Sequence, residues 1–165
     1  MLTARTASAL ALAMLCPAAA AVAAAPDAHA GMRIGNYELR SDRWNDVAWV
    51  WLVNHSCDGG DPRCGTPFSD PMVTTPTDDL NVTAVPRPSR NGTTFQNTAY
   101  HAGGRYTLTV DVVDGVRCFG QALPSHDVYS WDATSLQGTV TSTFETGCFG
   151  APGGTNVFNF ALEPM

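Results

Sequence analysis

Residues 105–115 have the sequence RYTLTVDVVDG, and they carry the clearest structural signal in the chain. Apolar and polar side chains alternate from 105 to 113, which is the period of a strand that buries one face. Asp114-Gly115 follows, a dipeptide that favours a type I′ turn because glycine accepts a positive φ. The pattern therefore predicts a hairpin in which residues 116–121 return antiparallel to the first strand.

Other strand-like segments occur along most of the chain, and no segment shows persuasive helical periodicity. Segment 47–54 is apolar on both faces, which is typical of a strand covered from both sides. Pro86 and Pro88 should end another strand, because proline cannot donate to a sheet. Residues 57–77 are rich in Gly, Pro and Asp and predict a long loop. The further strands are expected at 36–43, 47–54, 80–85, 93–102, 127–132, 138–146 and 155–162.

About eight short strands joined mostly by short turns indicate an all-β protein with antiparallel pairing. We expect a small meander barrel, with a β-sandwich as the alternative.

The first thirty residues resemble a targeting signal rather than part of the fold. Arg5 supplies a positive charge, residues 9–25 are mainly apolar, and residues 28–30 (Ala-His-Ala) fit the small-x-small pattern of a cleavage site. We therefore expect residues 1–30 to be a cleaved signal peptide and residues 31–165 to form a single secreted β domain. No segment after residue 30 is apolar over the roughly 20 residues that a transmembrane helix needs.

Four cysteines remain after the predicted cleavage site: Cys57, Cys64, Cys118 and Cys148. An even number in an exported chain predicts disulfide bonds. Cys57 and Cys64 bracket a turn-rich loop, which favours that pair and leaves Cys118 to bond Cys148, although the other pairings stay open. The spacings do not fit the close ligand pairs of a zinc site, so we expect two disulfides and no metal.

The charge balance excludes one large class of partner. The chain has 15 acidic and 9 basic residues, a net charge of −6, and no basic cluster. Nucleic-acid binding depends on neutralising phosphates, so we do not expect a nucleic-acid partner.

Several short motifs together carry a resemblance. They are G-x-Y-x-L-x-S-x-R-W from Gly35, W-x-W from Trp49, the four cysteines, Y-x-W-D from Tyr129, and G-G-x5-F-x-L from Gly153. In these features the chain resembles a group of small secreted proteins of mycobacteria and related actinobacteria. The resemblance covers nearly all of residues 31–165, but its motifs are structural and it brings no activity. No functional residue is carried over from it.

Ser125-His126-Asp127 places three catalytic residue types side by side. Successive strand residues point to opposite faces, so these three cannot converge as a nucleophilic triad. His55 and His101 lie in other segments, at spacings that do not indicate a metal site. We therefore assign no catalytic residue and expect no cofactor.

Trp49, Trp51, Tyr106 and Trp131 are the candidate ligand-contacting residues. Aromatic side chains commonly fill the core of a small domain, and they also line ligand pockets at the mouths of barrels. Both interpretations stay open at this point.

Two classes of function follow from these observations. We expect a non-enzymatic binding or interaction module outside the cell, with a small apolar ligand, an envelope component or a host protein as partner. The alternative is a small exported hydrolase whose site is not visible in the sequence. An open aromatic cavity would favour ligand binding, whereas a packed interior with an exposed apolar patch would favour an interaction protein.

Overall fold

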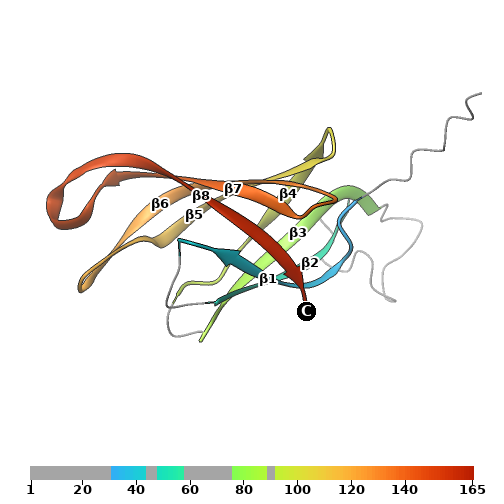
Figure 1. Ribbon diagram of the computed structural model, residues 1–165, viewed down its shortest axis with the longest axis horizontal. Coiled ribbons are helices and arrows are strands. Elements are labelled where there is room, and N and C mark those ends of the chain that lie inside the picture. Colours follow the sequence, from blue (N-terminus) through green and yellow to red (C-terminus); the bar gives the residue numbers. More distant parts are fainter. Residues whose placement is uncertain (1–30, 44–47, 58–75, 89–91) are drawn as a thin grey trace, which may run out of the picture.

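Eight antiparallel strands follow one another around a closed barrel in the order in which they occur along the chain (Figure 1). The computed structural model describes residues 31–43, 48–57, 76–88 and 92–165. The strands are β1 (Gly35–Ser41), β2 (Ala48–Cys57), β3 (Pro76–Arg87), β4 (Phe95–Ala102), β5 (Arg105–Cys118), β6 (Gln121–Asp132), β7 (Gln137–Thr146) and β8 (Pro152–Pro164), with a 3-10 turn η2 at Cys148–Gly150. The predicted all-β meander barrel is confirmed, and the sandwich alternative is not. Among these described residues, no helix has the length and apolar character needed to cross a membrane.

Pairing of the first strand with the last closes the barrel. Leu39 of β1 lies opposite Leu162 of β8, and the same strand pairs with β2 on its other side. Closure leaves neither β1 nor β8 with a free edge, which removes the usual sites of unwanted strand pairing.

The hairpin predicted from residues 105–115 exists, but its turn lies elsewhere. Strand β5 continues through Asp114-Gly115 to Cys118, so the predicted return strand at 116–121 is wrong. The register shifts between Val112 and Val116, which places Gly115 at a bulge where a Cβ would collide with the Ser125 side chain. Gly120, at a φ of +74°, makes the turn instead. Gly115 therefore lets the Ser125 side chain lie close to the backbone of β5, and it does not reverse the chain.

Strand β3 is also longer than predicted at both ends, because it begins at Pro76, within the predicted loop, and because Pro86 does not end it. Pro86 pairs with Trp49 of β2, whereas the pairing of β3 with β4 extends only from Leu80 to Ala84. Within the described residues, no residue of β4 pairs with Pro86, so its missing N–H costs no ladder hydrogen bond to that strand. On the outer face of β2, Val50 is 4% exposed and Leu52 is 37% exposed, so the predicted cover is present at Val50 and absent at Leu52.

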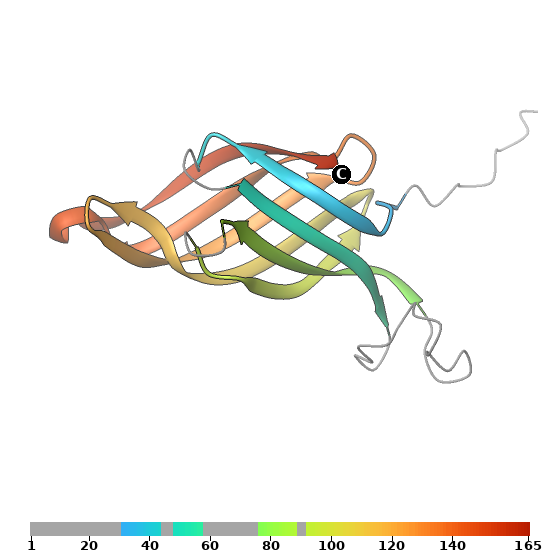
Figure 2. The ribbon, with the colours of Figure 1, turned by 90° about the horizontal axis from the view of Figure 1, so that it is seen from below.

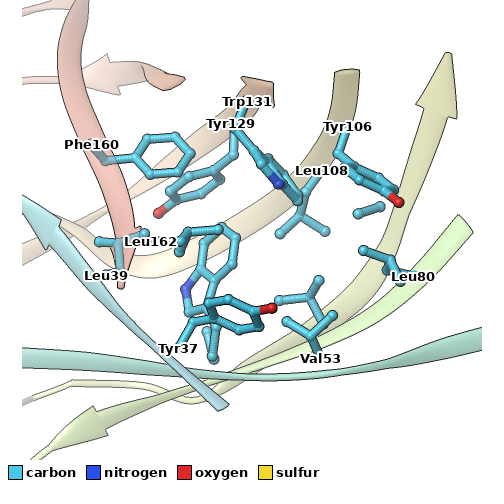
Figure 3. Packing of buried hydrophobic residues seen from close by; sticks show 14 of the residues in the cluster. Tyr37, Leu39, Val53, Leu80, Tyr106, Leu108, Tyr129, Trp131, Phe160 and Leu162 are labelled. Atoms are coloured by element: carbon cyan, nitrogen blue, oxygen red, sulfur yellow. The ribbon is translucent and has the colours of Figure 1, made fainter. Parts of the chain in front are cut away.

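Aromatic rings fill the middle of the barrel (Figure 3). The ring centroid of Trp51 lies 5.3 Å from that of Tyr129, 5.5 Å from that of Trp131 and 5.9 Å from that of Phe160. Such distances are in the favourable range for aromatic pairs. These side chains come from β2, β6 and β8, so their packing ties opposite parts of the wall together.

The two ends of the barrel are finished differently. At one end the buried Met32 side chain packs against the core, and its backbone N–H donates to Tyr106 Oη at 3.3 Å. At the other end the β5–β6 and β7–β8 hairpins project together (Figure 2). The Cys118–Cys148 disulfide joins them, with 5.6 Å between the Cα atoms, as the favoured pairing predicts. Cys64 and residues 1–30 lie outside the described residues, so the predicted Cys57–Cys64 bond and signal peptide do too.

Truncation of Trp51 should be severely destabilising. Trp51→Ala removes three ring contacts and leaves a cavity, so we expect the free energy of unfolding to fall by about 3–5 kcal/mol in urea denaturation. Tyr100, which is 65% exposed on β4, provides the control. Tyr100→Ala should change stability by no more than about 0.5 kcal/mol. Equal losses in the two variants would contradict the packing described here.

Candidate functional site

The four aromatic residues singled out from the sequence are all buried in the core cluster. Trp131 packs against Trp51 and stacks on Tyr106 with ring centroids 5.4 Å apart, whereas Trp49 lies farther along the barrel against Phe95 at 5.5 Å. A ligand placed among these rings would have to displace their contacts with one another.

A buried ion pair covers the aromatic core at the end where the hairpins project. Arg43 stands two residues after the end of β1. Its guanidinium lies 2.6 Å from one carboxylate oxygen of Asp127 and 3.2 Å from the other. Their side chains are 4% and 0% exposed. Two-pronged contacts of this kind are among the strongest charge-assisted hydrogen bonds.

Polar groups from three strands complete this cluster. Arg43 Nη2 donates to the Gly115 carbonyl at 2.8 Å and to Ser142 Oγ at 3.0 Å. Ser125 Oγ donates to Asp127 Oδ1 at 2.8 Å. The cluster therefore joins the segment after β1 to β5, β6 and β7, and the opposite charges of its ion pair offset each other.

The sequence contains a signal for this cluster in the position of Asp127 on β6. Asp127 stands two residues before Tyr129 and four before Trp131, so it shares their inward face. A carboxylate on a buried face needs a cation or several donors. Which arginine would supply the charge depends on where Arg43 lies relative to β6, and that is a tertiary property.

The phenol of Tyr129 lies next to this ion pair. Burial raises its pKa, and the Asp127 carboxylate raises that pKa further, while Arg43 acts in the opposite direction. Tyr129 therefore stays neutral in the folded protein, including at a pH where exposed tyrosines ionise.

Ser125, His126 and Asp127 do not form a triad. Ser125 and Asp127 point into the buried cluster, whereas the His126 ring is on the outer wall, with Nδ1 2.7 Å from Asp111 Oδ1. His126 and Asp111 are solvent-exposed. Within the part of the chain that the structure describes, no group of three or more His, Cys, Asp or Glu side chains could hold a metal ion.

A cleft of about 680 Å³ lies between the projecting hairpins. Arg43 is one of the residues lining it, and Phe144, Phe158 and the disulfide residue Cys148 line it as well. The guanidinium carbon of Arg43 lies 5.6 Å from the centroid of the Phe158 ring. The cleft therefore combines two phenylalanine rings with charged and polar side chains, which include Arg43, Arg117, Ser142 and Asn156.

Beyond this cleft, two phenylalanines occupy the ends of the hairpins. Phe119 is 96% exposed and Phe149 is 78% exposed. Each directly follows a cysteine of the Cys118–Cys148 disulfide, so the covalent bond holds the two turns together. We call residues 118–121 and 147–152 the paired tip.

The paired tip was not among the predicted sites, although a repeat in the sequence marks it. The tripeptide Cys-Phe-Gly occurs twice, at 118–120 and at 148–150. Both of its glycines have positive φ, +74° at Gly120 and +79° at Gly150. Each hairpin thus turns directly after its phenylalanine, and the ring is left at the end of the turn.

Comparisons with protein-family models, with curated proteins and with solved structures gave no match. The function is therefore inferred from the geometry of the described residues.

The buried ion pair can be tested with a double-mutant cycle. Asp127→Leu leaves the Arg43 guanidinium buried without its counter-charge, so we expect a loss of about 3–5 kcal/mol in the free energy of unfolding. The double variant Arg43→Met/Asp127→Leu removes both charges and should lose less than Asp127→Leu alone. Additive losses in urea denaturation would show that the two residues are not coupled.

Stability should also decrease at alkaline pH because of Tyr129. Its pKa is raised in the folded protein, so above about pH 10 the unfolded chain ionises this phenol while the folded chain does not. The contribution of the Tyr129 phenol to the free energy of unfolding is fully present below about pH 10 and decreases as the pH rises further. Tyr129→Phe should make the fall in the free energy of unfolding between pH 9 and 11 shallower, and an unchanged slope would contradict the assignment.

Proposed function

We propose that this protein is a non-enzymatic interaction module that acts outside the cell and contacts a component of the cell envelope through the paired tip. The observation that carries the proposal is the exposure of Phe119 and Phe149, 96% and 78%, at the joined ends of two hairpins. Exposed apolar clusters commonly mark interaction sites, and aromatic side chains commonly dominate binding energy.

The rest of the barrel supports a scaffold role. Aromatic side chains occupy the interior, and the outward positions of the central part of β5 are Thr107, Thr109 and Asp111, all exposed and polar. The apolar side chains at the paired tip therefore contrast with the polar wall of this strand. A closed barrel with a packed interior gives the tip a rigid support.

Two features support action outside the cell. Residues 1–30 have the pattern of a secretory signal peptide, and the Cys118–Cys148 disulfide suits an oxidising compartment. The alternative of an exported hydrolase is not favoured by any observation on the described residues, since Ser125 and His126 lie on opposite faces.

A sedimentation assay tests this function. The purified, disulfide-bonded chain is mixed with envelope fragments of the producing bacterium, and the bound fraction is measured after centrifugation. The wild type should sediment with the fragments, and Phe119→Ser/Phe149→Ser should bind roughly 100-fold more weakly, because burying one phenylalanine side chain contributes about 1.5–3 kcal/mol.

The control removes two apolar side chains that are exposed outside the tip. Ile34→Ser/Tyr100→Ser should sediment like the wild type, since these residues belong to the segment before β1 and to β4. Failure of the wild type to sediment, or equal binding by the tip variant, would contradict the proposal.

A further inference from the structure

We propose that the paired tip inserts its two phenylalanine rings into the surface of a lipid bilayer with zwitterionic headgroups. This inference rests on the proposed function and names the partner of the same surface. Figures 1 and 2 show both hairpin ends at the extremity of the barrel that faces away from the C-terminus. The tip can therefore approach a flat surface ahead of the rest of the molecule.

The size of the apolar surface favours a lipid over a protein partner. A phenylalanine buries about 150–250 Å² at most, so the two rings offer about 300–500 Å². A stable protein interface buries at least about 600 Å² on each partner, half of a total of about 1,200 Å², and needs a complementary surface around its anchors. Next to the rings in the sequence stand glycines, which offer no side chain to a protein partner: Gly120 follows Phe119, and Gly147 and Gly150 flank Cys148-Phe149. A bilayer accepts two projecting rings without any matching surface.

The absence of charge around the rings allows insertion. Residues 118–124 and 146–158 contain no Asp, Glu, Lys, Arg or His. The charged residues directly before these two segments are Arg117, which lies 3.3 Å from Asp114 in an ion pair, and the exposed Glu145. Bringing the tip into an interfacial layer therefore desolvates no charged side chain of these segments, which would otherwise be costly.

The overall charge points to neutral rather than anionic lipid. The chain carries a net charge of −6, so an anionic membrane would repel it at long range. Insertion thus depends on apolar burial and not on electrostatic attraction. Binding should be nearly independent of ionic strength, because salt screens charges and does not weaken apolar contacts.

The backbone holds the rings ready for this contact. Phe149 has a φ of +58°, a left-handed conformation that is uncommon for a bulky residue. The disulfide also holds the cysteines that precede the two rings with their Cα atoms 5.6 Å apart before any partner is bound. A prearranged pair loses little conformational entropy on insertion.

Flotation with phosphatidylcholine vesicles tests the proposal. The wild-type chain should float with the vesicles equally at 50 mM and 500 mM NaCl. Phe119→Ser/Phe149→Ser should bind about 100-fold more weakly, and Ile34→Ser/Tyr100→Ser should bind like the wild type. Both pairs of side chains are exposed, so the variants are expected to fold.

A tryptophan reporter gives an independent measurement. In Phe119→Trp the fluorescence difference from the wild type reports the environment of the tip. This difference should shift to shorter wavelength when vesicles are added, while Tyr100→Trp should show no shift. No shift in Phe119→Trp would overturn the insertion.

The outcomes separate this inference from the proposed function. Tip-dependent binding to envelope fragments without binding to vesicles would overturn lipid insertion, indicate a protein or glycan partner, and leave the interaction function standing. Loss of both would overturn both proposals. Vesicle binding that requires anionic lipid, or that is unchanged in Phe119→Ser/Phe149→Ser, would also overturn the inference.

Discussion

Packing of aromatic rings around Trp51 is the interaction on which the rest of the structure depends. This side chain from β2 contacts Tyr129 and Trp131 of β6 and Phe160 of β8, with ring centroids 5.3 to 5.9 Å apart. Strands far apart around the wall are thereby held to one centre. Because the rings occupy the middle of the barrel, contact with another molecule is expected at the wall or at an end.

Where the aromatic core ends, two other interactions hold the projecting end of the barrel: the Arg43–Asp127 ion pair and the Cys118–Cys148 disulfide. Arg43 and Asp127 cover the aromatic cluster, and their polar partners come from β5, β6 and β7. Beyond them the β5–β6 and β7–β8 hairpins extend with a cleft between them that Phe144 and Phe158 help to line. Hairpins without a full core are only marginally stable, and the Cys118–Cys148 bond links them covalently. The same bond joins the two cysteines that directly precede the exposed phenylalanines.

Local patterns predicted the architecture better than they predicted its details. Alternation along residues 105–113 and the even cysteine count led to the barrel and to the Cys118–Cys148 pair. Asp114-Gly115 was misleading because its glycine is required by the Ser125 side chain across the strands, a contact that local sequence does not reveal. Pairing of Arg43 with Asp127 likewise depends on tertiary geometry. The paired tip was within reach of the sequence through its repeated Cys-Phe-Gly.

The most direct test that the paired tip is the contact surface is hydrogen–deuterium exchange of the protein bound to envelope fragments. The disulfide-bonded chain is compared free and bound, and the exchange of each backbone segment is followed. We expect added protection in residues 118–121 and 147–152, with no change in β1 to β4, because only the tip meets the partner. Protection centred on β1 to β4, or on the end that Met32 covers, would contradict this account.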